Sequence, residues 1–274
     1  MACERIDFVK TRIISAIVGI ALLIAVLALG TPFIQIVVTL IGMLAVYELL
    51  NAVKLADRKS LLITALVGAA VMLVCLSFSL ALFLPALYMW LVALFVYYMA
   101  NRQTTVLKDV AITFLLTVYP CFLFGHLLYI RSMIYGNILI WAVFVCAFLT
   151  DTCAMFGGKF FGRHKLCPSL SPKKTVEGSI CGVIGCAISM LIYGTVCKLV
   201  AGVTPNYINI VIIALGASAI SQIGDLAASC IKREFGIKDY GNIMPGHGGV
   251  MDRFDSLLFV APFVCYMLMI FPIF

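Results

Sequence analysis

The chain is 274 residues long, 64% hydrophobic and only 11% charged, with a mean hydropathy of +1.16. Because soluble domains carry about 25% charged residues, this composition excludes an ordinary soluble protein and predicts an integral protein of the lipid bilayer. The formal net charge of +7 does not indicate a nucleic-acid partner, since the location of charges in a membrane protein matters more than their sum.

Apolar runs long enough to cross a bilayer, which requires about 20 residues per helix, recur along the whole chain. They predict an all-α, polytopic membrane protein with about nine transmembrane helices, at 13–29, 32–50, 61–79, 81–99, 110–130, 138–157, 176–197, 207–230 and 257–273. The third and fourth runs are joined by little more than Leu-Ser-Phe-Ser, so the count can change by one there. We divide this single membrane domain into scaffold helices over 1–137 and a catalytic region with polar loops over 138–274.

The charges predict the topology. If the N-terminus is cytoplasmic, the inside segments are 1–12, 51–60, 100–109, 158–175 and 231–256. Every Lys and Arg except Arg131 and Lys198 falls in these segments, so the positive-inside rule favours a cytoplasmic N-terminus and an outer C-terminus. All acidic residues lie in the same segments or at the inner ends of helices, which predicts a site that faces the cytoplasm.

The densest polar segment lies near the C-terminus, where residues 229–255 read SCIKREFGIKDYGNIMPGHGGVMDRFD. Ionisable groups gathered in one place of a membrane protein indicate a functional site. Asp225 lies just upstream of this segment, at a spacing that places it on one face of a helix with Ser229 and Lys232. An internal ion pair between Asp225 and Lys232 that fixes the helix register is the alternative.

Two further carboxylates, Asp252 and Asp255, are three residues apart at the expected start of a helix, so they would face the same way. Together with Asp225 they form a ligand set suited to Mg²⁺, a hard cation that prefers carboxylates, substrate phosphate oxygens and water. Capping of the helix N-terminus is the alternative, although it would account for only one of the acids.

A glycine-rich turn, Pro-Gly-His-Gly-Gly at 245–249, comes directly before that helix. Glycines allow backbone N–H groups to approach an anion, and a helix N-terminus adds a favourable dipole. We therefore predict a phosphate site at His247, Gly248 and Gly249. The neighbouring cations would serve the same site: Lys232, Arg233, Lys238 and Arg253.

A second polar segment begins at Asp151, at the inner end of an apolar run, and continues to Ser-Pro-Lys-Lys-Thr-Val-Glu-Gly at 171–178. Lys173 and Lys174 are predicted to bind phosphate, with ordinary anchoring of an inside loop as the alternative. Thr175 is placed to cap the helix that follows.

Other polar residues within the apolar runs receive no functional role. Glu48, near the end of the second run, is interpreted as a partner of Lys54 or as an interfacial residue. His126 stands alone on an apolar face and is interpreted as structural. The cysteines include no CxxC pair and lie mostly in apolar runs, where Cys behaves as a small hydrophobic residue.

The residues together describe a cytoplasm-facing, Mg²⁺-dependent pocket with many cations. Phosphoryl or nucleotidyl transfer fits such a pocket best, because these reactions require a metal and cations to neutralise charge on phosphate oxygens.

The segment 229–255 also closely resembles the signature of the bacterial-type phosphatidate cytidylyltransferases, the CDP-diacylglycerol synthases. The matching positions are Ser229, Lys232-Arg233, Lys238-Asp239, His247-Gly248-Gly249 and Asp252-Arg253-Phe254-Asp255. Met244 stands where the family usually has Leu, Ile or Phe, which is an apolar exchange. The segments at Asp151-Thr152 and 171–178 are similar to the family as well.

The resemblance implies that CTP and phosphatidate react to give CDP-diacylglycerol and pyrophosphate. It implies Mg²⁺ on Asp225 and Asp252, with Asp255 assisting or holding a second cation, and a hydrogen bond or metal contact from Ser229. The remaining implied site residues bind phosphate or complete the catalytic and substrate-binding set: Lys173, Lys174, Thr175, Asp151, Lys232, Arg233, Lys238, Asp239, His247, Gly248, Gly249 and Arg253. The resemblance further implies a multi-pass protein of the bacterial inner membrane and a homodimer.

Two alternatives come from other classes. A different lipid-phosphate transferase, such as a CDP-alcohol phosphotransferase, would require a denser run of Asp residues with Ala-Arg between them, which the sequence lacks. An ion or lipid transporter would require ionisable groups that reach both sides of the membrane, whereas the predicted outer face carries only Arg131 and Lys198.

Overall fold

The computed structural model describes residues 17–19, 21–241, 243 and 248–274, and almost all of its regular structure is helical. Among these residues, eight helices are long and apolar enough to cross a membrane: α2 (Thr31–Ala52), α3 (Lys59–Phe78), α4 (Phe83–Ala100), α5 (Leu107–Ser132), α6 (Gly136–Phe161), α7 (Val176–Ala201), α8 (Tyr207–Glu234) and α9 (Met251–Ile270). Described residues between 17 and 29 are helical too. The all-α, polytopic class is therefore confirmed.

The helix ends differ from the predicted ones in two informative places. α3 and α4 are separate helices, because Ser79 is extended and a short 3-10 turn, η1 (Leu80–Leu82), follows it. α9 begins at Met251 rather than at 257, so the Asp-Arg-Phe-Asp segment forms its first turns. Polar residues can extend an apolar run in this way when their side chains satisfy the free N–H groups of a helix start.

The chain divides into two compact units, which we describe separately. Unit 1 combines Met1–Tyr129 with Phe235–Phe254, and unit 2 combines Ile130–Glu234 with Asp255–Phe274. The division lies close to the predicted boundary at 137/138, but it assigns residues 235–254, most of the C-terminal polar segment, to unit 1. The assignment of scaffold and catalytic roles to the two halves stays a prediction.

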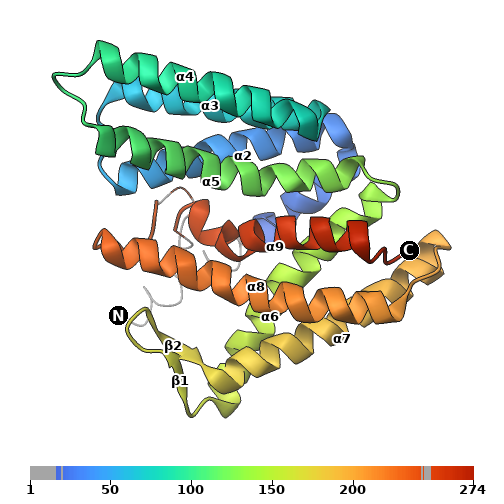
Figure 1. The fold of residues 1–274 in the computed structure, drawn as a ribbon. Helices are drawn as coiled ribbons and strands as arrows, with labels where there is room; N and C mark the ends of the chain where they lie inside the picture. The colour runs from blue at the N-terminus through green and yellow to red at the C-terminus, as the bar shows by residue number, and fades with distance from the viewer. Residues whose placement is uncertain (1–16, 20, 242, 244–247) are drawn as a thin grey trace. The chain divides into compact units, whose positions relative to one another are not determined.

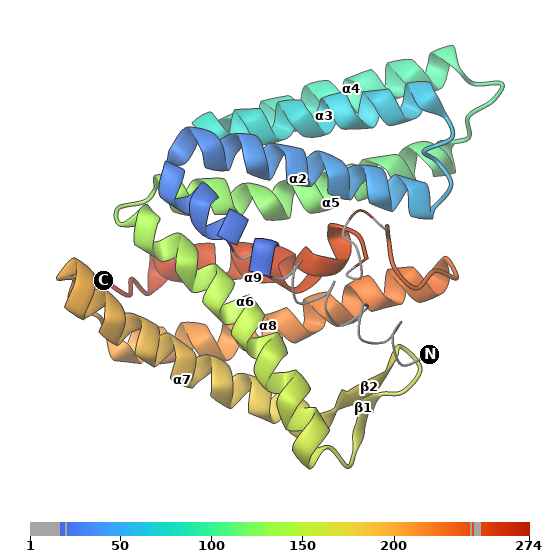
Figure 2. The ribbon, with the colours of Figure 1, turned by 180° about the vertical axis from the view of Figure 1, so that it is seen from behind.

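Unit 1 is built from neighbouring helices. α2 packs on α3 and α3 packs on α4 (Figure 1 and, from behind, Figure 2). The ring of Trp90 on α4 stacks on Phe114 of α5 at 5.7 Å between centroids. A Cβ atom on Gly68 of α3 would lie only 1.9 Å from the Trp90 ring, so a glycine is needed for α3 and α4 to approach this closely.

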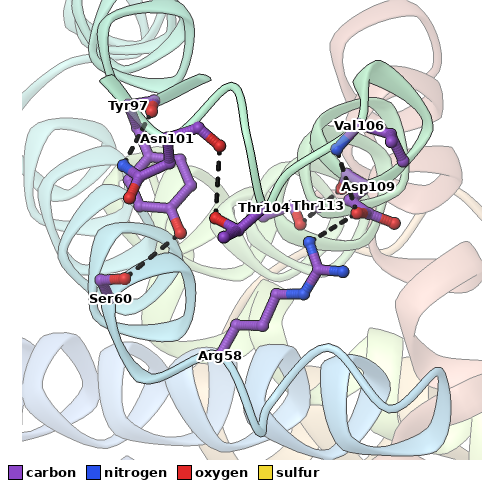
Figure 3. A network of polar contacts seen from close by, with 8 residues as sticks. All are labelled: Arg58, Ser60, Tyr97, Asn101, Thr104, Val106, Asp109 and Thr113. Atoms are coloured by element: carbon purple, nitrogen blue, oxygen red, sulfur yellow. Dashed lines mark hydrogen bonds and ion pairs between the residues drawn. The ribbon is translucent and has the colours of Figure 1, made fainter. Parts of the chain in front are cut away.

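Polar contacts at one end of unit 1 join the residue before α3 to the start of α5, and the start of α3 to the end of α4 (Figure 3). The guanidinium of Arg58 donates to Asp109 at 2.6 Å. The hydroxyls of Ser60 and Tyr97 are 3.2 Å apart. These contacts bring the predicted inside segments 51–60 and 100–109 to the same end of the unit, as the charge pattern requires. The side of the membrane on which this end lies stays a prediction.

Unit 2 contains α6, α7 and α8, which pack on one another, and a small β-hairpin (Figure 2). The hairpin pairs β1 (Lys165–Cys167) antiparallel with β2 (Ser171–Thr175), so that Lys165 faces Thr175. The sequence predicts no strands in this segment. The hairpin holds the Ser-Pro-Lys-Lys-Thr segment against the start of α7.

The opposite end of unit 2 holds the C-terminus. The backbone N–H of Asn206 donates to Ile273 O at 2.9 Å, and the side chain of Asn209 donates to Pro272 O at 2.7 Å. The predicted outer loop before α8 and the predicted outer C-terminus therefore lie together. Between the two ends, α8 approaches α9 closely, because a Cβ on Gly224 would lie 2.9 Å from Phe259.

Candidate functional site

In unit 1, the Asp252 carboxylate accepts hydrogen bonds from backbone N–H groups before and within the glycine-rich segment. Its Oδ2 atom accepts hydrogen bonds from the N–H groups of Tyr240 at 2.7 Å and Gly249 at 3.0 Å, and the residue is only 8% exposed. Gly248 has φ +84°, and a Cβ there would lie 3.0 Å from Asp252 Oδ2 and 3.5 Å from Asp239. Four signature residues thus lie together, and Asp252 satisfies backbone donors at the start of α9, as the capping alternative expected.

Glu48 is a member of this arrangement that the sequence did not predict. Its carboxylate lies 1% exposed at the end of α2 and accepts the N–H of Val250 at 2.9 Å and of Met251 at 2.8 Å. These partners replace the predicted pairing with Lys54. A buried acid at the end of an apolar run requires a partner, but no local pattern indicates one about 200 residues away.

A pocket of about 550 Å³ opens beside Glu48 in unit 1. Its lining includes Tyr47, Asn51, Lys54 and the signature residue Asp239. Pockets that hold small molecules typically have volumes of about 300–1,000 Å³. The pocket therefore has the size and the polar lining of a binding site, and it borders the signature segment.

The remaining signature residues are placed as follows. Lys238 and Arg253 are exposed, and Lys232 is half-buried at the end of α8. Arg233 donates to the carbonyl of Leu170 at 3.4 Å, which connects the end of α8 to the hairpin. His247 lies outside the described residues, so its predicted role stays a prediction.

In unit 2, an ion pair joins the second polar segment to α8. Lys174 of β2 forms an ion pair with Asp225 of α8. The partner that the structure shows for Asp225 is thus a lysine from the hairpin. Ser229, one turn further along α8, is buried. Lys173, next to Lys174, is exposed.

Two more acids of unit 2 lie within electrostatic reach of this pair. Asp255 on α9 is 8% exposed and interacts with the charges of Asp225, Asp151 and Lys232. One of its oxygens accepts the N–H of Ser256 at 2.8 Å. Three carboxylates that repel one another favour a bound cation, and the two lysines supply part of the compensating charge.

The donor chemistry of these acids fits Mg²⁺, which takes one or two carboxylates and completes its shell with water and phosphate oxygens. Among the described residues, no group of three or more His, Cys, Asp or Glu side chains is placed so that it could hold a metal ion. The described contacts of Asp252 and Asp225 fall in different units. A site that relies on substrate oxygens needs fewer protein ligands, so Mg²⁺ binding stays a prediction.

Thr175 has a clear structural role in unit 2. Its hydroxyl accepts the N–H of Gly178 at 3.1 Å and caps the N-terminus of α7, which confirms the predicted cap. Cβ atoms on Gly158 or Gly162 of the α6 end would lie 2.9 Å from this hydroxyl. The cap therefore connects the hairpin, α6 and α7.

Replacing Thr175 with Ala is expected to destabilise the protein by about 1 kcal/mol, because one N–H of α7 loses its acceptor. In a chain of this length, that loss lowers the thermal midpoint by about 2–4 °C. Thermal unfolding of the detergent-solubilised protein measures it. Thr175→Ser keeps the hydroxyl and should unfold near the wild-type midpoint, whereas equal losses in both variants would contradict the capping role.

Comparison with known proteins assigns the family. The model of the cytidylyltransferase family matches residues 10–271. The chain is 34% identical to the phosphatidate cytidylyltransferase of Bacillus subtilis, over 96% of this chain and 98% of that protein. The phosphatidate cytidylyltransferases of Staphylococcus saprophyticus and Staphylococcus epidermidis are 34% and 30% identical, each over 92% of this chain and 96% of the relative.

The matches extend over nearly the whole chain, whereas the signature alone covers only residues 229–255. They include α2 with Glu48 and the hairpin with Lys174, which the signature does not contain. The chain therefore belongs to the cytidylyltransferase family.

Proposed function

We propose that this protein transfers a cytidylyl group from CTP to phosphatidate, giving CDP-diacylglycerol and pyrophosphate. The observation that carries the proposal is the 34% identity, over 96% of the chain, to a protein named phosphatidate cytidylyltransferase. The membrane-spanning helices agree with a lipid substrate, and the clustered cations and acids agree with phosphate chemistry. Neither a CDP-alcohol phosphotransferase nor a transporter is favoured by any of these observations.

In the proposed reaction, an oxygen of the lipid phosphate forms a bond to the α-phosphorus of CTP. The bond between the α-phosphorus and the bridging oxygen breaks, and pyrophosphate leaves with the electron pair. No general base is required, because a phosphate monoester with a second pKa near 6 is already ionised at neutral pH. The protein's task is therefore to position two anions and to neutralise their charge.

The cations of the polar segments would hold these anions. Lys174 forms an ion pair with Asp225 in the structure. At this position its ammonium group would contact a phosphate that is brought to the acids of unit 2. The pocket beside Glu48 would receive a polar part of a substrate next to Asp239. The other residues proposed to bind phosphate or to complete the substrate site are Lys173, Lys232, Arg233, Lys238, Asp239, His247, Gly248, Gly249 and Arg253.

Mg²⁺ remains the proposed cofactor, with Asp225, Asp252 and Asp255 as its proposed ligands and Ser229 as a hydrogen-bond donor or metal contact. When bound, the ion supplies charge neutralisation on the phosphate oxygens. The acids would hold the ion, and Asp252 would at the same time keep the start of α9 in place through its hydrogen bonds from Tyr240 and Gly249.

We further propose that the protein lies in a bacterial inner membrane with its polar segments on the cytoplasmic face. The support is the charge pattern, in which all but two of the Lys and Arg residues fall in the predicted inside segments. Cysteine labelling from either side tests the orientation: a thiol introduced near Arg58 should react only with a reagent that enters the cytoplasm. A homodimer stays a prediction, and light scattering of the solubilised protein measures it.

Pyrophosphate release by the purified, solubilised protein tests the activity. The proposal expects release only when CTP, phosphatidate and Mg²⁺ are all present. Omission of any one component should reduce release to the background of a protein-free mixture. Release that persists without phosphatidate, or none in the complete mixture with folded protein, would contradict the proposal.

A further inference from the structure

Glu48 is one of two buried carboxylates that together hold the backbone around the start of α9. Asp252 accepts the N–H of Gly249, and Glu48 accepts those of the next two residues, Val250 and Met251. Three successive backbone donors are therefore bound by two acids. One acid comes from α9 itself, whereas the other comes from α2, about 200 residues earlier.

The glycines around Glu48 show how closely the segment is fitted to it. A Cβ on Gly249 would lie 2.5 Å from both oxygens of the Glu48 carboxylate, and a Cβ on Gly241 would lie 2.5 Å from one of them. Any side chain at these two positions would displace the carboxylate. The segment that carries Asp239 and the segment that carries Asp252 therefore both close on Glu48.

Burial of a carboxylate in an apolar helix bundle is costly, and an apolar side chain of similar size would serve packing alone. Glu48 instead directs both oxygens at backbone donors of the segment that bears the catalytic signature. Backbone N–H groups at a helix start would otherwise turn to water or to a bound anion. The carboxylate thus determines which donors remain for a substrate.

We propose that Glu48 is a positioning residue for the cytidylyl transfer, holding the first turn of α9 so that Asp252 faces the reacting phosphates. Glu48 acts through the backbone of Val250 and Met251 and not by direct contact with the transferred group. The inference rests on the proposed function for its kinetic consequence, while its structural part is independent of it.

Glu48→Gln is the sharpest variant, because it preserves the shape of the side chain. The amide oxygen can still accept one N–H, but the amide nitrogen faces the other donor and that hydrogen bond is lost. Loss of a residue that orients a catalytic group typically costs about 10–100-fold in activity. We therefore expect kcat to fall at least tenfold, while the KM values for CTP and phosphatidate change less than threefold.

Hydrogen exchange followed by mass spectrometry provides a readout that does not depend on activity. In Glu48→Gln, the amides of peptides covering residues 248–252 should exchange faster, while peptides from α3 and α4 should exchange as in the wild type. The matched control is Gln35→Ala on the same helix. Gln35 donates to Ser77 O at 3.2 Å, far along α2 from the signature segment. It should leave both kcat and the exchange of 248–252 unchanged.

Gly241→Ala tests the same contact from the other side. Its new methyl group should push on Glu48 and reproduce the loss in kcat, and adding it to Glu48→Gln should lower kcat by less than a further threefold.

The outcomes separate the inference from the proposed function. Faster exchange with an unchanged kcat would make Glu48 structural only, and a change confined to KM would make it a substrate contact; either overturns the inference. An inactive wild-type protein would instead overturn the proposed function. Unchanged hydrogen exchange in Glu48→Gln would overturn the structural part of the inference, whether or not the wild-type protein is active.

Discussion

Asp252→Asn is expected to lower kcat by about 10²–10³-fold while the protein remains folded. In the structure a single carboxylate oxygen, Oδ2, accepts the N–H groups of both Tyr240 and Gly249. The amide oxygen of Asn can accept the same two hydrogen bonds, so the start of α9 keeps its acceptor. What the variant removes is the negative charge that we propose to hold Mg²⁺. Steady-state kinetics at saturating CTP and phosphatidate measure the loss.

Asp252→Ala separates the two roles of this residue. It removes the charge and the acceptor together, so it should be as inactive as Asp252→Asn but less stable, by about 1 kcal/mol. Thermal unfolding of both variants in the same detergent gives the comparison. If Asp252→Asn keeps activity within tenfold of the wild type, Asp252 is only a helix cap and does not belong to the metal site.

Asp225→Asn is expected to have an effect of the same size, about 10²–10³-fold in kcat. Asp225 pairs with Lys174, and both side chains are mostly buried, with 29% and 24% exposed. Each single variant therefore leaves one partly buried charge without its partner, which lowers stability. The double variant Asp225→Asn with Lys174→Gln removes both charges, so its stability should recover towards the wild type. Its activity should remain low, because both the acid and the lysine proposed to contact a phosphate are lost.

The double variant tests whether the ion pair between Asp225 and Lys174 has only a structural role. Recovery of both stability and activity would show that Asp225 only fixes α8 against the hairpin. Ser179→Ala is the matched control, since Ser179 of α7 hydrogen-bonds to Gln222 of α8 in the same unit. It removes a contact between helices without touching an acid, and it should leave kcat within a factor of three.

The helices were predictable because each is a long apolar run. Eight of the predicted runs correspond to the helices α2 to α9, with ends that differ by a few residues. The start of α9 was placed too late because hydropathy measures only apolar character. Asp252 and Arg253 are helical here, since Asp252 and Glu48 satisfy the donors of the first turn.

The hairpin could not be predicted from the sequence. β1 has three residues and β2 has five, with Pro172 near the start of β2. Strands this short show no reliable alternation, and Pro argues against a strand. Their pairing depends on contacts with α6 and α7, which exist only in the folded chain.

The candidate site was predictable in its residue types and only partly in its contacts. The spacing predicted that Asp252 and Asp255 lie on one helix, and the cations of the segment 171–178 indicated Lys174. Asp225 was predicted to bind Mg²⁺, with an ion pair to Lys232 of its own helix as the alternative. The structure instead shows an ion pair with Lys174 of the hairpin, which no spacing along the chain indicates. Glu48 received no role, because its partners lie in a segment that no local pattern connects to α2.

The fate of each phosphate of CTP tests the central claim most directly. The purified protein is incubated with phosphatidate, Mg²⁺ and CTP labelled at either the α- or the γ-phosphate. Our account predicts that the α-label appears in the lipid extract as CDP-diacylglycerol and the γ-label appears in pyrophosphate. A γ-label in the lipid, or an α-label that never leaves the aqueous phase while CTP is consumed, would contradict cytidylyl transfer to phosphatidate.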